Sequence, residues 1–268
     1  MKLCLDIGNT HVFGGIFQED GSILTSFRYE TKDIGTSDQF GLFLINYLKL
    51  FKINRSDIES IGVSSVVPSV NYSISSACYK YLNINPKFIT VNDLGMKVET
   101  DNPSQIGADL ISAAIAVAKE HPRENAIIVD FGTATTLSIL SRKNEYLGTI
   151  IMPGFRIAME SLMTKAAQLF SVEIKKPDNP VGKNTTASIQ SGIYYQQLGA
   201  VKELIDRIKK DYFNSEKVLV IGTGGFVHLF EEENVFSELK PNLVLEGIKI
   251  SLPIKNQPTL FFHSSSRK

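Results

Sequence analysis

The amino-acid sequence predicts an α/β fold made of two related halves that pack around a cleft. One short phrase occurs twice, as Leu5 to Thr10 and as Val129 to Thr136. In both places an apolar run ends in Asp, and Gly, a hydroxyl residue and another β-prone run follow, which predicts a β-hairpin in each half. The expected order of elements is β-β-β-α-β-α-β-α, and a similar run comes after it. With 268 residues, 43% of them hydrophobic, the chain can bury a proper core.

The first half is expected to open with three short strands, because β-prone runs alternate there with turn residues. A helix should follow at 37–51, where apolar residues have helical spacing and Asp38 lies near the start. The elements expected in this half are strands at 2–8, 11–17 and 22–30, the helix at 37–51, a buried strand at 58–67 that Pro68 ends, a helix at 71–82, a strand at 88–91, a loop at 92–105 and an alanine-rich helix at 107–120.

The second half starts with a strand at 126–130 that leads into the second copy of the repeated phrase. Pro153-Gly154 marks a break before the next helix. The later elements are a strand at 146–152, a helix from 155 to about 169, a polar loop at 172–184, a long helix from about 185 to 209, a strand at 217–221, a helix at 241–251 and a polar tail from 255. The expected domains are therefore an N-terminal half at 1–117, a C-terminal half at 118–255 and a tail at 256–268.

Composition excludes several classes of function. The formal net charge is zero and the pI is about 6.9, which argues against nucleic-acid or membrane-surface binding. The two cysteines, Cys4 and Cys78, lie in apolar contexts without metal-ligand spacing, and a disulfide between them is not expected. No signal peptide and no apolar run long enough to span a membrane are expected, so the sequence favours a reducing cytoplasm.

The repeated turn suits phosphate chemistry. Gly8 and Gly132 let the backbone approach a ligand, and N–H groups and Thr hydroxyls can then point at phosphate oxygens. An Asp at the mouth of such a turn can hold Mg²⁺. The first copy, Asp6 to Thr10, taken alone is more typical of an ordinary hairpin than of a phosphate site. The second copy favours a phosphate site, because three threonines cluster after the buried Asp130.

Further residues each allow two interpretations. Gly222 to Gly225 follow a strand and either approach a flat ligand such as adenine or form a glycine turn before a helix. The GxxxxGK[ST] and GxGxxG signatures are missing, so a nucleotide must be held in another way. Asp109 is either a helix N-terminal acid or a general base that takes a proton from a substrate hydroxyl. Arg156 and Lys165 flank the helix after Gly154 and either face an anion or lie on the solvated surface, of which the surface is favoured. The four histidines show no metal spacing.

Together, these segments resemble the sugar kinase, Hsp70 and actin superfamily, and within it type III pantothenate kinase. The resemblance spans nearly all of residues 1–252. It rests on six segments in order: D-x-G-N-T from Asp6 to Thr10, D-N-P-x-x-x-G-A-D from Asp101 to Asp109, D-F-G-T-A-T-T from Asp130 to Thr136, G-T-I-I-M-P-G-F from Gly148 to Phe155, G-K-N-T from Gly182 to Thr185 with Q-S-G from Gln190 to Gly192, and G-T-G-G from Gly222 to Gly225.

The resemblance implies two ribonuclease-H-like halves, as in actin-like ATPases, around a nucleotide cleft. It implies ATP-dependent phosphorylation of pantothenate to 4′-phosphopantothenate, the first step of coenzyme A biosynthesis, by a cytoplasmic homodimer with Mg²⁺ and a monovalent cation, K⁺ or NH₄⁺. The roles that it implies are Asp109 as the base, Asp6 on Mg²⁺ and the phosphates, Gly8, Asn9, Thr10, Gly132 and Thr133 on phosphates, Gly224 and Gly225 on adenosine, Asp130 on the monovalent cation, and Thr100, Gly107, Ala108, Leu110 and Thr185 around pantothenate.

Two positions depart from the family pattern. The family usually has Tyr where this chain has Thr100, and Arg where this chain has Leu110. A hydrogen bond to a charged group contributes about 1.5–3 kcal/mol, so losing a cationic anchor would weaken capture of an anionic acceptor. Two alternatives therefore stay open, a related small-molecule kinase with an altered acceptor and a non-catalytic nucleotide-binding regulatory factor. The presence of Asp6, Asp109 and Asp130 argues against simple loss of catalysis.

Overall fold

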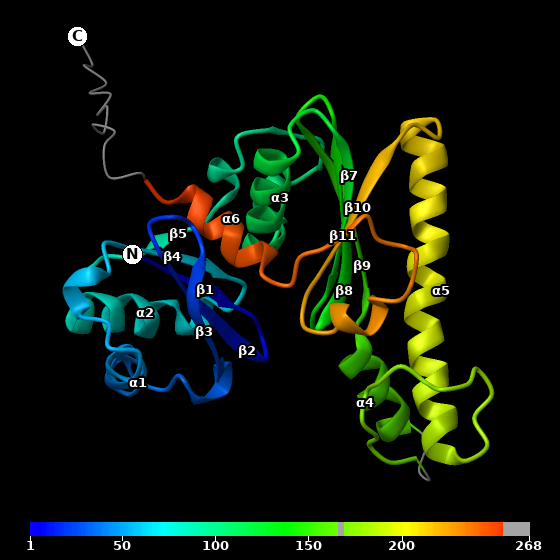
Figure 1. Cartoon of the computed structure of the whole chain (residues 1–268), viewed down its shortest axis with the longest axis horizontal. Coiled ribbons are helices and arrows are strands. Elements are labelled where there is room, and N and C mark those ends of the chain that lie inside the picture. Colours follow the sequence, from blue (N-terminus) through cyan, green and yellow to red (C-terminus); the bar gives the residue numbers. More distant parts are fainter. Residues whose placement is uncertain (166–168, 254–268) are drawn as a thin grey trace.

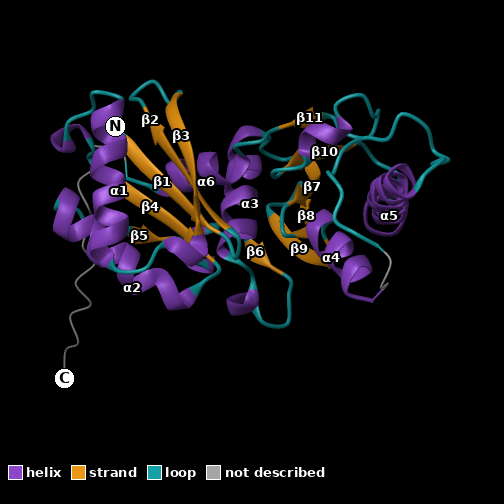
Figure 2. Ribbon diagram, turned by 90° about the horizontal axis from the view of Figure 1, so that it is seen from below, coloured by secondary structure: helices purple, strands orange, loops and turns teal. Residues whose placement is uncertain are grey.

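The computed structural model describes residues 1–165 and 169–253, and it contains two β-sheets with helices between them and on their outer faces (Figures 1 and 2). The first sheet has the strand order β3-β2-β1-β4-β5. In it, β1, β2 and β3 are antiparallel neighbours, whereas β4 and β5 run parallel to β1. Its strands are β1 (Lys2–Ile7), β2 (His11–Phe17), β3 (Ile23–Glu30), β4 (Ser60–Ser65) and β5 (Lys87–Phe88).

The second sheet repeats this topology. Its order β9-β8-β7-β10-β11 has the same antiparallel meander and the same two parallel strands, and β6 is added at the β9 edge. The predicted relation between the two halves is thus confirmed in the topology of their sheets. The strands are β6 (Lys97–Val98), β7 (Asn125–Phe131), β8 (Ala134–Ser141), β9 (Glu145–Pro153), β10 (Val218–Thr223) and β11 (Glu238–Leu239).

Four helices cover the outer faces of the sheets. In the first half, α1 (Ser37–Leu50) and α2 (Pro68–Ala77) bury Phe40 and Ile74 in a core with β1 and β4. In the second half, α4 (Phe155–Lys165) and α5 (Thr185–Phe213) pack in the same way over β7 and β10. Side-chain caps fix the starts of two of these helices: Thr36 and Gln39 form a capping box at α1, and Asn184 accepts the Ala187 N–H at α5.

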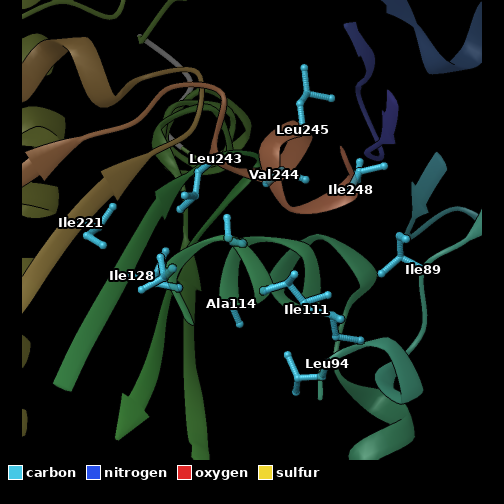
Figure 3. Close-up of a cluster of buried hydrophobic side chains, with 14 of the residues drawn as sticks. Ile89, Leu94, Ile111, Ala114, Ile128, Ile221, Leu243, Val244, Leu245 and Ile248 are labelled. Carbon is cyan, nitrogen blue, oxygen red and sulfur yellow. The ribbon is translucent and has the colours of Figure 1, made fainter. Parts of the chain in front are cut away.

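Two helices lie between the sheets and join the halves. The buried residues of α3 (Ala108–Glu120) and α6 (Leu243–Ser251) form one core with Ile128 of β7 and Ile221 of β10 (Figure 3). The two helices touch so closely that a Cβ at Gly247 would overlap the Ser112 carbonyl oxygen. The predicted domain boundary at residue 117 falls inside α3, and the division into domains stays a prediction.

Several predicted boundaries were wrong in detail. The helix expected at 71–82 begins at Pro68, because proline is well suited to the first turn of a helix, and it passes into a π turn at Cys78. The strand expected at 88–91 is the short β5, and the loop expected at 92–105 contains β6, whose β-propensity alone is too weak to reveal a strand of this length. The helix expected to reach about 169 extends to Lys165 in the described part, and residues 166–168 lie outside it, as does the predicted tail from 255.

Two further expectations concern the cysteines and the membrane. Cys4 and Cys78 are both buried and free, as predicted. Among the helices of the described ranges, none is long and apolar enough to cross a membrane.

Candidate active site

A cavity of about 370 Å³ lies where the two Asp-Gly turns face each other. Both turns, the glycine segment after β10 and the start of α6 line it, so segments that are far apart in the sequence meet there. The predicted site residues that line this cavity are Asp6, Gly8, Asn9, Thr10, Asp109, Asp130, Gly132, Thr133, Gly224 and Gly225.

The sheet register explains why Asp6 and Asp130 occupy equivalent places. Each lies near the end of the first strand of its half, next to a hydroxyl residue of the parallel neighbour, Ser64 for Asp6 and Thr223 for Asp130. The turns that follow are closed by backbone hydrogen bonds, in which Gly8 N–H donates to the His11 carbonyl at 3.0 Å and Gly132 N–H donates to the Ala134 carbonyl at 3.1 Å.

The two turns also touch across the cleft. The hydroxyls of Thr10 and Thr133 lie 3.1 Å apart, within hydrogen-bonding distance. A phosphate chain entering between the halves would therefore meet hydroxyl and N–H donors from both sides, which is the arrangement that phosphoryl groups need.

Three carboxyl groups share this confined space, and burial is the main cause of their raised pKa values. The pKa of Asp6 rises to about 8, because desolvation and the charges of Asp109 and Asp130 oppose its ionisation, although the Ser64 hydroxyl donates to it at 3.1 Å. Burial and Asp109 together raise the pKa of Asp130 to about 7. Desolvation also raises the pKa of Asp109, and the Leu110 N–H, which donates to its Oδ1 at 2.8 Å, partly opposes this effect.

These shifts predict how stability depends on pH in the ligand-free protein. In the unfolded chain an Asp has a pKa of about 3.9. Above about that pH the folded chain therefore holds protons on Asp6 and Asp130 that the unfolded chain has lost. Their contribution to the free energy of unfolding is therefore greatest below that pH, and it is lost as pH rises through the folded pKa values of about 8 and about 7. Asp130→Asn should thus reduce the fall in Tm between about pH 5 and about pH 8, measured by calorimetry. The exposed Asp211→Asn is the control, and an unchanged slope in Asp130→Asn would contradict the prediction.

The donor set fits a cation that arrives with phosphate. Among the residues that the structure describes, no group of three His, Cys, Asp or Glu side chains could hold a metal ion alone. Mg²⁺ is commonly held by one or two carboxylates together with substrate phosphates and water, and Asp6 beside the phosphate turns offers such a partial set.

Three basic side chains lie in the cavity wall, and sequence reasoning missed two of them, His11 and Arg28. His11, Arg28 and Arg156 all line the cavity. The expectation that Arg156 lies on the solvated surface was incomplete, because it is exposed but faces the cleft, with its guanidinium 5.8 Å from the Phe226 ring centroid. No motif singles out Arg28, and only its register opposite Phe13 in the meander of the first sheet would have indicated its position.

The structure does not bring all the residues expected around the acceptor to one place. Ala108 and Leu110 are buried at the start of α3, beside Asp109. The Thr100 hydroxyl is buried without a hydrogen-bond partner in the described chain. Thr185 begins α5 and lines a separate open hollow, so the structure does not bring it to the cavity of Asp109.

Comparisons with known proteins show which family and which fold this chain resembles. The sequence profile of a family described as type III pantothenate kinase matches residues 2–207. A type III pantothenate kinase of Legionella pneumophila is 44% identical over 252 residues, which cover 94% of this chain and 98% of that protein. Type III pantothenate kinase 1 of Francisella tularensis is 42% identical, covering 93% of this chain and 98% of that protein. Among solved structures, a Campylobacter jejuni protein assigned to the Baf family of transcriptional activators has a similar fold, with a TM-score of 0.56 and 18% identity over 93% of this chain and 96% of that one.

Proposed function

This chain belongs to the type III pantothenate kinase family, and from that premise we propose how its cleft phosphorylates pantothenate with ATP, the first step towards coenzyme A. The observation that carries the proposal is the meeting of both Asp-Gly turns, the glycine segment and Asp109 in one cavity. Phosphoryl transfer needs positioning and charge neutralisation more than covalent help, and this cavity offers both.

We assign the base to Asp109. It is the one of the three carboxyls that lies on a helix start rather than in a phosphate turn, next to the residues expected around the acceptor. Its raised pKa brings its basicity closer to that needed to accept the proton of the pantothenate hydroxyl at neutral pH.

The two turns are assigned to the phosphates. Backbone N–H groups at Gly8 and Gly132, together with Asn9, Thr10 and Thr133, would hold the phosphate oxygens from opposite sides. Asp6 would hold Mg²⁺, directly or through water, and Mg²⁺ when bound would neutralise charge on the β- and γ-phosphates. Gly224 and Gly225 would lie along the adenosine, where the absence of side chains allows close approach.

A monovalent cation, K⁺ or NH₄⁺, is assigned to Asp130. Asp130 lies where the ends of β7 and β10 are paired. Among the described residues, no Ser, Thr or Lys side chain donates a hydrogen bond to its carboxyl. A cation there would relieve the desolvation that raises its pKa.

The test is a coupled ADP-release assay with ATP, Mg²⁺ and K⁺, with and without pantothenate. Turnover that depends on pantothenate supports the proposed function. Nucleotide binding without that turnover would favour a changed acceptor or a non-catalytic regulatory role. The first would fit Thr100 and Leu110, which depart from the pattern of the family.

We also propose that the chain works in the cytoplasm as a homodimer. Thr185 does not line the cavity of Asp109 in the same chain. If Thr185 contacts pantothenate, the Thr185 of a second copy would have to reach that cavity. Leu162 lines the same hollow as Thr185, and Val181 and Phe170, on the segment that precedes α5, are 76% and 51% exposed, so this part of the surface is rich in exposed apolar side chains. Sedimentation velocity should give a dimer, and a monomer at assay concentration would rule this arrangement out.

A further inference from the structure

Arg28 lies in a row of three side chains that crosses the first sheet. The register pairs Asp6 of β1 with Phe13 of β2, and Phe13 with Arg28 of β3. Directly paired residues of antiparallel neighbours lie on the same face of a sheet, and all three residues line the cavity. The sheet itself therefore presents the Arg28 guanidinium to the cleft.

The aromatic ring between them holds the guanidinium in place. The Arg28 guanidinium carbon lies 4.4 Å from the centre of the Phe13 ring, a cation–π contact. Its positive charge reaches Asp6 two strands away, where it partly opposes the rise in the pKa of that carboxyl that burial causes. The Arg28 guanidinium makes no hydrogen bond or ion pair among residues 1–165 and 169–253. Its donors are consequently free for a ligand.

The second half has no counterpart to this group. There the equivalent row runs from Asp130 to Thr136 and then to Ile151, which is 70% exposed and does not line the cavity. Arg156 also lines the cavity, and it lies over Phe226 directly after the glycine segment rather than in a row across a sheet. Arg28 is thus the cavity arginine that shares a row across the first sheet with Asp6.

Resting on the proposed function, we propose that Arg28 is a catalytic residue that contacts the transferred phosphoryl group of ATP and neutralises the charge that gathers on it during transfer. A guanidinium is suited to this task, because its fork of N–H donors matches two phosphoryl oxygens at once. Held over Phe13, it needs little reorganisation when the phosphates arrive.

The experiment compares Arg28→Gln, Arg28→Lys and Arg28→Ala with wild type, and Arg55→Gln serves as a control on the same half, outside the cavity. Removing one preorganised charge-stabilising donor should lower kcat about 10²-fold in Arg28→Gln. Arg28→Lys should fall between Arg28→Gln and wild type, since it keeps the charge and loses the fork. Added methylguanidinium should restore part of the rate of Arg28→Ala by occupying the place over Phe13.

A binding measurement separates this inference from the proposed function. By calorimetry, Arg28→Gln should bind a non-hydrolysable ATP analogue about tenfold more weakly than wild type, with ADP affinity unchanged, because only the analogue carries the γ-phosphoryl group. Wild-type kcat in Arg28→Gln, or a raised KM for pantothenate alone, would overturn the inference. Wild-type protein without pantothenate turnover would instead overturn the proposed function, and the binding comparison would still test Arg28.

Discussion

Asp109→Asn is expected to lower kcat for pantothenate phosphorylation by about 10²–10⁴-fold, the usual contribution of a general base. The amide keeps the shape of the side chain and can still accept the 2.8 Å hydrogen bond from the Leu110 N–H, so α3 should start as before. It cannot take the proton of the acceptor hydroxyl. Initial rates over a range of ATP and pantothenate concentrations measure the effect.

The position of Asp109 predicts which parameters stay unchanged. It lies in neither phosphate turn, so the affinity for ATP should change little, and removing one of three mutually repelling carboxyls should not destabilise the fold. Asp211→Asn, on the exposed side of α5, should behave as wild type. A kcat for Asp109→Asn within about threefold of wild type would remove Asp109 from the role of base, since a lost general base costs at least about 10²-fold.

Much of the fold could be predicted because its signals are local. The strands of both meanders show β-prone runs between turn residues, and the repeated phrase indicates from sequence alone that the two halves are related. Short pieces that depend on tertiary pairing could not be predicted in this way. β6 has two residues, and it exists because the edge of β9 is available to pair with it.

The residues of the site also differ in how far they could be predicted from local sequence patterns. Asp6, Asp130 and the glycines lie in turns with a recognisable pattern, and the structure brings them to one cavity. Arg28 and Arg156 have no such pattern, because a basic residue on a strand or a helix start is usually solvated. Their position follows from strand register and from how the halves face each other, which are long-range properties of the packed chain.

Local sequence patterns predict the acceptor end of the cleft least well. Leu110 is buried among apolar residues of α3, and a cation at that position is not expected to fit without a partner. The hydroxyl of Thr100 is buried without a hydrogen-bond partner in the described chain, and Thr100 does not line the cavity of Asp109. Recognition of pantothenate would then depend on residues other than those of the family pattern, and the ADP-release assay addresses this question directly.

Gly224→Ala is expected to disable the nucleotide site and to destabilise the fold as well. Gly224 has φ of +93°, a conformation that L side chains rarely adopt. A Cβ there would meet the Phe131 backbone nitrogen at 2.6 Å and would overlap Asp130 Oδ1. The segment after β10 would have to move away from the end of β7, which displaces both the glycines proposed to lie along adenosine and the carboxyl assigned to the monovalent cation.

We expect a loss of about 1–3 kcal/mol in the free energy of unfolding, the usual cost of strain or overpacking of this kind, together with loss of measurable ATP binding. Thermal unfolding and calorimetric titration measure the two effects. Gly225→Ala is the matched control for stability, because no heavy atom lies within 4 Å of a Cβ at that position. Its Tm should equal that of wild type, whereas equal Tm values for Gly224→Ala and Gly225→Ala would mean that the segment after β10 is free to shift. In that case the close approach of Gly224 to the end of β7 would not be what holds the glycine segment in place at the cleft.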